Sequence, residues 1–222
     1  NTAMGWQALL AGGSSNTAIG REALESCTGS NNTALGFQAG QNITSGNNNL
    51  MLGHDAGKTG SPGGNFTTHV NRITLGDGNI IEFNCQVSLN VASDERDKTD
   101  FTELDIGLDF VKQLNPLTYR WDKRSKYGDK YADDYDLNAQ TPDGTHKEEQ
   151  LDVGFKAQEV EVLEKSAGYK IADKTNLLTN LSGDGKQYSM KYEKFVPILV
   201  KAIQELSAKN DALEARIKTL EG

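Results

Sequence analysis

A repeat near the start of the chain constrains the fold more than any other feature of the sequence. Its units begin 15, 16 and 17 residues apart, and each consists of Asn, a short apolar run and Gly: Asn1–Gly5, Asn16–Gly20, Asn32–Gly36 and Asn49–Gly53. One short strand per repeat, with turns rich in Gly and Asn, is typical of a stacked β structure. Such a unit cannot bury its own apolar face, so it must stack on neighbouring units or on the same unit of another copy.

Aligned apolar residues favour this structure over a low-complexity linker: Met4, Ile19, Leu35 and Leu52. The pattern changes after residue 60. Arg72–Leu75 and Asn79–Phe83 flank a Gly-Asp-Gly turn and predict two strands. Gln86–Val91 alternates polar and apolar residues, which predicts a further strand that leads directly into Ala92 and Ser93.

The composition changes near residue 92. Residues 1–92 contain 15 of the 23 glycines and eight charged residues, whereas the remaining 130 residues carry the other 46 charges. We therefore predict Gly/Asn-rich β repeats over 1–60, a β-strand region over 61–92 and a separate domain over 93–222.

Helical and strand patterns are mixed in the domain that starts at residue 93. The apolar spacing predicts a helix over Asp105–Leu114, ended by Pro116, and another over Ala157–Leu163. Short strands and a long polar loop are predicted in this order: Leu117–Trp121, the loop Tyr127–Lys147, Val153–Phe155 and Lys186–Met190.

The last thirty residues follow an unbroken heptad pattern. The a and d positions are Val196, Ile203, Asn210, Ile217 and Leu199, Leu206, Leu213, Leu220. The pattern predicts a coiled coil over about residues 194–221, with Lys209 and Glu214 able to pair between parallel helices. Such a helix needs partners in water, so we expect the chain to oligomerise. Ile at a with Leu at d leans toward a dimer, and Asn210 mainly sets the register, so the number of helices stays open.

Charge and cysteine content exclude several functions. A net charge of −8 argues against nucleic-acid binding, and no apolar run reaches the roughly 20 residues that insert across a membrane. Cys27 and Cys85 follow no metal-ligand spacing, so we expect free thiols and assembly in a reducing cytoplasm. No metal or cofactor is expected. Because the chain starts at Asn1, we expect it to be the C-terminal part of a longer protein.

Other polar residues in the sequence offer little chemistry. His54, His69 and His146 are isolated and are expected to be surface or turn residues. Asp133–Asp134 and Glu148–Glu149 are interpreted as solvated loop charges rather than a carboxylate pair for sugar hydrolysis.

Residues 93–98, Ser-Asp-Glu-Arg-Asp-Lys, are the strongest candidate for chemistry. A serine becomes a nucleophile only when a base takes its proton, and a desolvated, neutral lysine can be that base. The carbonyl nearest to Ser93 is that of Ala92, so the motif indicates self-cleavage rather than action on a diffusing substrate. The spacing of Ser93 and Lys98 is weak evidence alone, because a Ser and a Lys in a charged loop are ordinarily both solvated.

The run Ser93-Asp94-x-Arg96-x-Lys98 resembles the start of the C-terminal intramolecular chaperone domain of phage tail spikes and tail fibres. That domain also occurs in endosialidase tail spikes, phage neck appendages and the myelin regulatory factor. Similar motifs follow in order and extend the resemblance over residues 93–222: Asn115–Trp121, Gly154–Val160, Tyr188–Tyr192 and the coiled coil. The repeats in 1–60 are more loosely similar to those of phage fibres and trimeric bacterial adhesin heads.

The resemblance implies a mixed fold, with an N-terminal all-β repeat shaft in a homotrimer and a small α+β chaperone domain that ends in the coiled-coil helix. It also implies that Ser93 is the nucleophile and Lys98 its general base, in a serine peptidase that cuts itself once, in cis, between Ala92 and Ser93. Asp94 and Arg96 would orient the loop or support the transition state. Asp97 occupies a position that is often apolar in the family. A carboxylate beside Lys98 favours the charged amine, so we expect cleavage that is slow or depends on assembly.

Three functional hypotheses follow. The first is the C-terminal part of a phage tail fibre or spike, assembled in the host cytoplasm and located in the virion, whose chaperone domain drives trimerisation and then releases itself. Its partners would be its own copies and a host-cell receptor or polysaccharide. The second is an uncleaved structural or adhesive fibre tip in which the domain is a permanent trimer clamp. The third, an enzyme acting on host polysaccharide, has no support in these residues.

Overall fold

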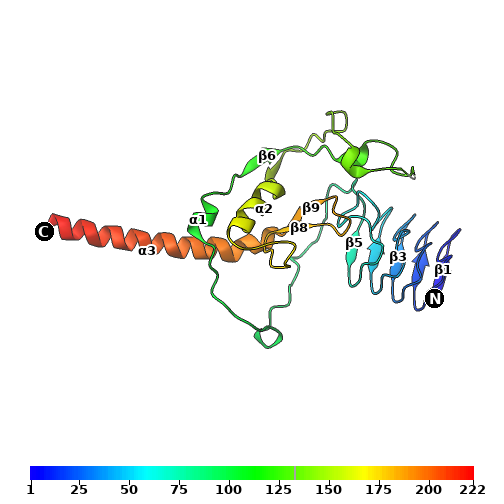
Figure 1. Cartoon of the computed structure of the whole chain (residues 1–222), viewed down its shortest axis with the longest axis horizontal. Coiled ribbons are helices and arrows are strands. Elements are labelled where there is room, and N and C mark those ends of the chain that lie inside the picture. The colour runs from blue at the N-terminus through cyan, green and yellow to red at the C-terminus, as the bar shows by residue number, and fades with distance from the viewer. Residues whose placement is uncertain (133) are drawn as a thin grey trace. The chain divides into compact units, whose positions relative to one another are not determined.

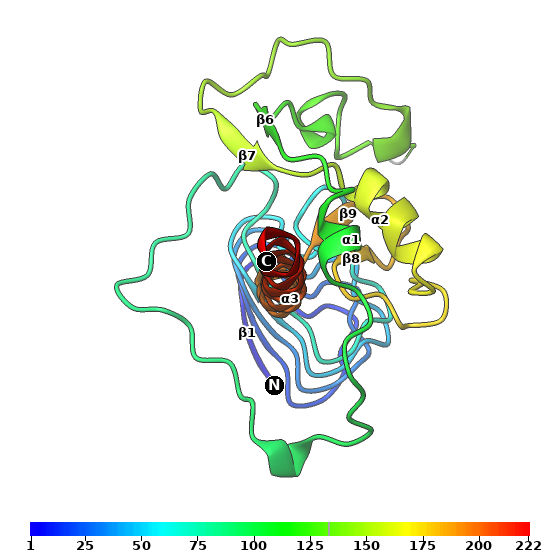
Figure 2. The same ribbon diagram turned by 90° about the vertical axis from the view of Figure 1, so that its left-hand side faces the viewer.

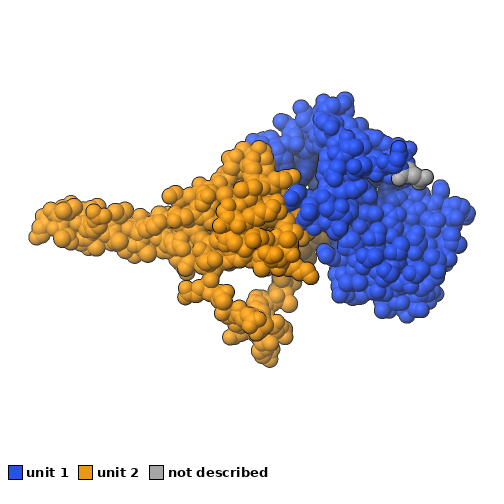
Figure 3. Space-filling model, in the orientation of Figure 1, with its two compact units in different colours: residues 1–82, 118–152, 181–189 blue, residues 83–117, 153–180, 190–222 orange. Residues whose placement is uncertain are grey.

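The computed structural model describes residues 1–132 and 134–222, so that Asp133, expected to be a solvated loop charge, lies outside the described residues. The chain forms two compact units (Figure 3). Unit 1 comprises residues 1–82, 118–152 and 181–189, and unit 2 comprises residues 83–117, 153–180 and 190–222. The units interleave along the chain, and the domain limits at residues 60 and 92 stay predictions.

Unit 1 contains a β-solenoid, which confirms the stacked β structure predicted from the repeat (Figure 1). Five short strands pair in parallel, in sequence order, to form one sheet: β1 (Thr2–Met4), β2 (Thr17–Ile19), β3 (Thr33–Leu35), β4 (Leu50–Leu52) and β5 (Ile73–Leu75). Figure 2 shows the successive turns of the solenoid one behind another. Each repeat therefore supplies one rung, and each rung is covered by the next.

The middle residue of each of three neighbouring strands points into the interior of the solenoid. Ala18, Ala34 and Met51 are fully buried, and they are aligned by the register of β2, β3 and β4. The predicted apolar residues are also aligned but lie on the opposite, outer face of the sheet, because successive strand residues point to opposite faces. We call this row the outer column: Met4, Ile19, Leu35, Leu52 and Leu75. Met4 and Leu35 are 67% and 50% exposed, so the outer column does not belong to the core.

A ladder of buried Asn side chains explains the Asn that opens each repeat. Oδ1 of Asn16 accepts a hydrogen bond from the backbone N–H of Asn32 (2.8 Å), and Nδ2 of Asn16 donates to the carbonyl of Gly29 (2.8 Å). Asn32 makes the same two contacts with the next rung, to Asn49 N (3.1 Å) and to the carbonyl of Gly46 (2.8 Å). Each amide thereby satisfies backbone groups that would otherwise be buried without partners.

The Gly that closes each strand is required by the spacing of the rungs. Gly20 has a φ of 132°, and a Cβ placed there would lie 2.3 Å from the carbonyl oxygen of Gly36 in the next rung. Only a residue without a side chain fits this backbone and this close approach.

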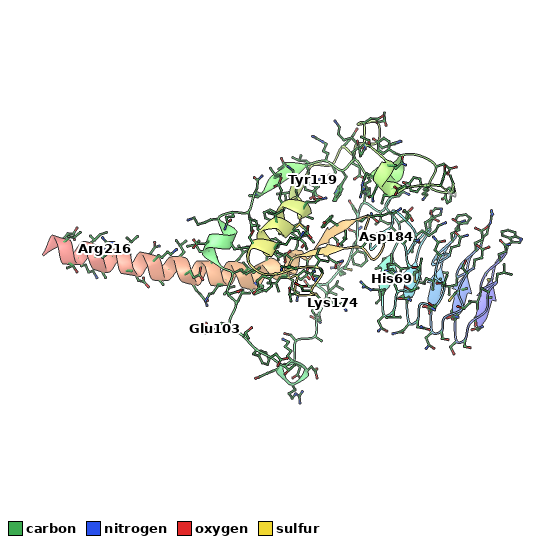
Figure 4. All side chains as sticks on the ribbon, in the orientation of Figure 1. His69, Glu103, Tyr119, Lys174, Asp184 and Arg216 are labelled. Atoms are coloured by element: carbon green, nitrogen blue, oxygen red, sulfur yellow. The ribbon has the colours of Figure 1, made fainter. Side chains whose placement is uncertain are left out.

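The last rungs of the solenoid are covered by two later segments of unit 1. The turn between β8 (Thr179–Leu181) and β9 (Tyr188–Met190) contacts residues 64–69, where Oδ2 of Asp184 accepts a hydrogen bond from Asn65 N (2.9 Å). Figure 4 labels Asp184 and His69 in this region. The segment 118–152 contributes Lys130 and Tyr131, which bind the buried Asp55. A solenoid needs such a cap because its terminal rung has no further repeat on it.

Two strand predictions between the solenoid and residue 92 are wrong for the single chain. Asn79–Phe83 and Gln86–Val91 are both fully described, and neither contains a strand. The turn at Gly76–Gly78 is present, but the chain continues as an exposed extended segment. A strand needs a neighbour that accepts its backbone hydrogen bonds, and this segment pairs with no strand among the described residues.

Three further strand predictions, Leu117–Trp121, Val153–Phe155 and Lys186–Met190, are confirmed within a residue or two as β6, β7 and β9. β6 (Leu117–Tyr119) pairs with β7 (Asp152–Gly154), and β8 pairs with β9. The predicted polar loop Tyr127–Lys147 contains the short 3-10 helix η3 (Leu137–Ala139), and η2 (Arg124–Lys126) precedes it. Leu137 is 1% exposed and anchors the loop.

Unit 2 packs three α-helices around one apolar cluster. The helices are α1 (Leu108–Val111), α2 (Ala157–Ser166) and α3 (Phe195–Glu221), and the cluster consists of Ile106, Phe110, Val160, Leu178, Phe195 and Ile198. The helix predicted over Asp105–Leu114 is reduced to one turn, because Gly107 before it has a non-helical conformation (φ −150°, ψ −125°). Oε2 of Glu205 on α3 accepts a hydrogen bond from Leu108 N (2.8 Å) and so caps α1.

One carboxylate is buried in unit 2. Glu164, on α2, is 1% exposed and accepts hydrogen bonds from the backbone N–H groups of Leu177 (2.7 Å), Leu178 (2.7 Å) and Thr179 (2.9 Å) and from the Thr179 hydroxyl. A buried charge is tolerated only when it is fully hydrogen-bonded in this way. Glu164 therefore holds the segment that leads into β8.

The long C-terminal helix is confirmed as α3, and it begins directly after the 3-10 helix η4 (Tyr192–Lys194). Its buried residues, Phe195, Ile198 and Ala202, lie on a different face from the heptad stripe. The heptad residues are exposed in the chain, with Ile203 at 66%, Leu213 at 54% and Leu220 at 83%. The coiled coil stays a prediction, and its stripe is available to partner helices.

Candidate functional site

Ser93 and Lys98 lie at the two ends of a single turn of 3-10 helix, η1 (Glu95–Asp97). Figures 1 and 2 show this turn in the extended segment between β5 and α1. The turn is closed by backbone hydrogen bonds from Asp97 N to Asp94 O (3.2 Å) and from Lys98 N to Glu95 O (3.1 Å). Ser93 and Lys98 are five positions apart in the sequence, and this single turn brings them together.

The two motif residues between them build this turn. Asp94 is its N-cap, and Oδ1 of Asp94 accepts a hydrogen bond from Arg96 N (2.9 Å). The Arg96 guanidinium binds the same carboxylate through Nη2 (2.6 Å) and Nε (3.0 Å). Hydrogen bonds from the Arg96 side chain, and then from its backbone, hold the pKa of Asp94 below its ordinary value, and the same contact raises the pKa of Arg96. Asp94 and Arg96 thus orient the loop.

The Lys98 amine contacts the Ser93 hydroxyl. Nζ of Lys98 lies 2.6 Å from Oγ of Ser93 and 3.2 Å from the carbonyl oxygen of Ser93. This distance is short enough for direct proton transfer from the hydroxyl to a neutral amine. The geometry therefore allows Lys98 to activate Ser93, with the chain's own backbone beside the nucleophile.

Solvent surrounds the dyad in the single chain. Every residue from Ala92 to Asp100 is exposed, and the Arg96 side chain is 88% exposed. Burial is what makes a lysine a useful base. The turn thus brings the two groups together, but in this chain nothing removes water from them.

A second cluster of polar groups was not found from the sequence. Nδ1 of His54 lies 3.3 Å from Oδ2 of Asp55 and 3.6 Å from Oδ2 of Asp77, and the donor atoms of the three residues fall within the 4.8 Å that a metal ion could use. The Lys130 ammonium, however, lies 2.6 Å from Asp55 and 3.4 Å from Asp77. An ammonium group therefore already pairs with both carboxylates.

Electrostatics support this interpretation of the cluster. Burial lowers the pKa of Lys130, but the hydrogen bond to Asp55 and its charge outweigh burial and raise it. The cluster joins a rung of the solenoid to the segment 118–152, so its role is structural. The repeat alignment contained a signal for it, since Asp55 follows its Gly at the same position as Glu22 and Gln38, which are also buried.

The remaining expectations for polar residues need correction at two positions. His69 stacks on Phe66 (4.8 Å between centroids) and is partly buried, which lowers its pKa. Glu148 is not a solvated charge: its side chain is 16% exposed and pairs with Lys123 (2.9 Å) and Lys126 (3.4 Å). The Lys123 hydrogen bond lowers the pKa of Glu148. A carboxylate that pairs with two lysines stabilises the fold.

Unit 2 also contains a shallow cavity of about 110 Å³. It lies between the turn after α1 and helix α2, and it is lined among others by Asn115, Phe155 and Glu159. These residues belong to two of the motifs that carry the family resemblance. Its place between packed helices indicates that the motifs mainly shape the domain core.

No helix in the described part of the chain has the length and apolar character needed to cross a membrane.

No curated protein matches the chain. Residues 93–169, about a third of the chain, match the model of the family described as the chaperone of endosialidase, and the match begins at Ser93. The C-terminal intramolecular chaperone domain predicted from the motifs is therefore confirmed over these residues, and this part of the chain is similar to the chaperone of endosialidase.

Proposed function

We propose that this chain is the C-terminal part of a phage tail fibre or spike. Its chaperone domain drives homotrimerisation and then releases itself by cleavage between Ala92 and Ser93. The β-solenoid remains in the virion, where the mature trimer binds a host-cell receptor or polysaccharide. The observation that carries this proposal is the 2.6 Å contact between Lys98 Nζ and Ser93 Oγ, at the residue where the family match begins.

Cleavage follows from the chemistry of this contact. Neutral Lys98 takes the proton of the Ser93 hydroxyl, and Oγ attacks the carbonyl carbon of Ala92. The new C–O bond forms as the Ala92–Ser93 peptide bond breaks, and the proton passes from Lys98 to the departing nitrogen. Water then hydrolyses the ester, which leaves a carboxylate on Ala92 and a free amine and hydroxyl on Ser93. A nucleophile in the same chain avoids the entropic cost of binding a substrate, which can reach about 7–11 kcal/mol.

Two exposed apolar surfaces support self-association. The heptad stripe of α3 is uncovered in the single chain, and a helix of this kind is stable in water only with partners. In the outer column of the solenoid Met4, Leu35 and Leu75 are also exposed, and the column continues at every rung. Copies aligned in parallel would bring both surfaces against their counterparts and remove them from water.

A permanent trimer clamp is the second candidate function. The observation that favours it is the full exposure of residues 92–100, because a hydrated lysine is a poor base. In this case the domain would hold three copies together without leaving them.

The two candidates are separated by the intact mass of the purified chain. We expect fragments of 92 and 130 residues from the unaltered protein, with Ser93 as the new N-terminus, and only full-length chain from Ser93→Ala. Ser88→Ala, a matched change in the same exposed segment, should cleave normally. A full-length parent that is nevertheless trimeric would leave the clamp as the function.

A further inference from the structure

The Lys130 ammonium lies against two carboxylates of the solenoid that, with His54, have the geometry of a metal-binding set. Nζ of Lys130 is 2.6 Å from Oδ2 of Asp55 and 3.4 Å from Oδ2 of Asp77. Nδ1 of His54 is 3.3 Å and 3.6 Å from the same two oxygen atoms. All four residues belong to unit 1, which Figure 3 shows in blue. A cation of the chain itself therefore lies where these side chains converge.

The solenoid holds the three possible ligands without help from Lys130. His54 and Asp55 follow β4, and Asp77 follows β5 in the neighbouring rung. The His54 ring stacks on Phe37 (5.1 Å between centroids), and the backbone N–H of Asp55 donates to the Phe37 carbonyl (2.9 Å). Oδ1 of Asp77 accepts a hydrogen bond from Asn79 N (2.9 Å). The donor atoms are thus positioned by contacts within residues 1–82.

The proposed cut places the three ligands and their cation in different fragments. The ligands precede the cut, whereas Lys130 and Tyr131 follow it. Tyr131 donates a hydrogen bond from its hydroxyl to Oδ2 of Asp55 (3.1 Å), so Asp55 loses two partners when the chaperone domain leaves. Asp55 and Asp77 are only 3% and 7% exposed in the uncleaved chain. Neighbouring, poorly hydrated carboxylates without a counter-charge are unstable, so the cleaved fragment favours a replacement cation.

The second oxygen of Asp55 points to the same conclusion independently. Oδ1 of Asp55 is buried, and no group in the described residues donates a hydrogen bond to it. Buried carboxylate oxygens are ordinarily hydrogen-bonded, so this atom retains unused capacity to bind a cation. Lys58 does not supply that cation, because its Nζ donates to Gln38 and Gln41 (2.6 Å each).

We propose that departure of the chaperone domain opens a site for a divalent transition-metal ion, best matched by Zn²⁺, between His54, Asp55 and Asp77. This inference rests on the cleavage proposed above. One imidazole nitrogen and two carboxylate oxygens suit Zn²⁺, with water as the fourth ligand, whereas Mg²⁺ and Ca²⁺ prefer oxygen ligands alone. The ion balances both carboxylates and joins the rung of β4 to the rung of β5. It thereby replaces the fastening that Lys130 supplies before the cut.

The site can be opened without cleavage by removing the ammonium group. In the uncleavable Ser93→Ala chain, Lys130→Met keeps most of the length of the side chain and removes its charge. We expect this double variant to bind one Zn²⁺ per chain in isothermal titration calorimetry. Its affinity should be at least about tenfold higher than that of Ser93→Ala alone, because an ammonium beside bound Zn²⁺ is strongly repelled.

Two further variants of the Ser93→Ala chain serve as controls. Lys126→Met removes a lysine of the same segment that is similarly exposed (25% against 22% for the Lys130 side chain) but pairs with Glu148, so it should gain no Zn²⁺ binding. Adding His54→Ala to Lys130→Met should abolish the binding. Binding that persists without His54 would come from another group, such as the exposed Cys85 thiol, and would overturn the proposal.

The cleaved parent provides a second measurement that needs no substitution, and it remains informative if Lys130→Met fails to fold. We expect it to bind Zn²⁺ as tightly as the double variant. A parent that cleaves, with neither protein binding Zn²⁺, would overturn the metal site and leave the proposed function standing. Zn²⁺ binding by the double variant beside a parent that never cleaves would support the site and overturn the release that is proposed to open it.

Discussion

The amine nitrogen of Lys98 lies 2.6 Å from the hydroxyl oxygen of Ser93, across one turn that is capped by Asp94 and closed by its pairing with Arg96. All four residues of the motif therefore contribute to one local arrangement, in which Asp94 and Arg96 form the turn that brings Ser93 and Lys98 into contact. Because the arrangement is local, it forms in the single chain and does not require another subunit. In the proposed function, removal of water from the amine is left to assembly.

Replacing Lys98 with Arg tests the base. Arg is charged at every accessible pH and cannot accept the Ser93 proton, although it keeps the positive charge and the length of the side chain. We expect cleavage of Lys98→Arg to be at least about 100-fold slower, measured as the rate at which the 92-residue fragment appears. Lys112→Arg, an exposed change in the same unit, should cleave at the parental rate. Normal cleavage by Lys98→Arg would exclude the dyad.

Replacing Asp97 with Leu tests the departure from the family pattern. Removing a carboxylate beside Lys98 favours the neutral amine, so we expect cleavage to become faster by about twofold to fivefold, the range for an exposed charge pair. Glu95→Leu removes the same charge from the same turn but not from the position beside Lys98. If both variants accelerate cleavage equally, net charge rather than the position of Asp97 sets the rate.

Replacing Leu35 with Lys tests the outer column. Leu35 is 50% exposed, so the variant should keep the β-sheet circular dichroism of the parent while its self-association weakens. The control is Leu10→Lys, which is 64% exposed but outside the column. Light scattering of the 92-residue fragment should show a lower molar mass for Leu35→Lys only. A similar loss in Leu10→Lys would indicate a general effect of charge.

Replacing Glu164 with Ala tests the buried carboxylate. The change leaves three buried backbone N–H groups without an acceptor, so we expect unit 2 to lose about 2–4 kcal/mol of unfolding free energy. Denaturant unfolding, followed by the helical circular dichroism, measures the difference. Gln158→Ala, on the exposed face of the same helix, should cost less than about 0.5 kcal/mol. Equal stability of the two variants would contradict the role of Glu164.

Tyr169 gives unit 2 an alkaline pH dependence. A hydrogen bond to Asp105, and then burial, raise the pKa of Tyr169 from 10.0 to about 12. Since the folded pKa is above the unfolded one, the contribution of Tyr169 to stability is complete below pH 10 and is lost as the pH rises toward 12. The phenol of Tyr169 should therefore titrate late in the ultraviolet absorbance. Tyr169→Phe should remove that phenol, and the stability difference between the two proteins should shrink above pH 10.

The comparison of stability between the parent and Tyr169→Phe can also contradict this prediction. If the difference between the parent and Tyr169→Phe is the same at pH 8 and near pH 12, the hydrogen bond to Asp105 does not set the pKa. Exposed tyrosines elsewhere in the chain, such as Tyr131, titrate in both proteins and cancel in the comparison.

Local patterns were sufficient to predict several elements. The Asn and Gly of each repeat predicted one rung per unit, because the amide ladder and the close approach at Gly20 act between equivalent positions of consecutive repeats. The heptad pattern predicted α3, since helix period and apolar spacing are properties of the segment itself. Ser93 and Lys98 were named as a pair from the motif and its resemblance, because their spacing alone was weak evidence, and the turn that brings them together is seen only in the structure.

The sequence by itself therefore determined the rungs and the long helix, and it named Ser93 and Lys98 as candidates. Tertiary structure decided which strand face is inside: only the register of the rungs shows that Ala34 is buried and Leu35 is not. It also brought together groups far apart in the chain, such as Asp55 with Lys130 and Glu164 with Thr179. The physical reason is the separation along the chain between the groups that interact. Turns and helices are stabilised by contacts between near neighbours, whereas burial and ion pairing depend on segments whose approach no local pattern encodes.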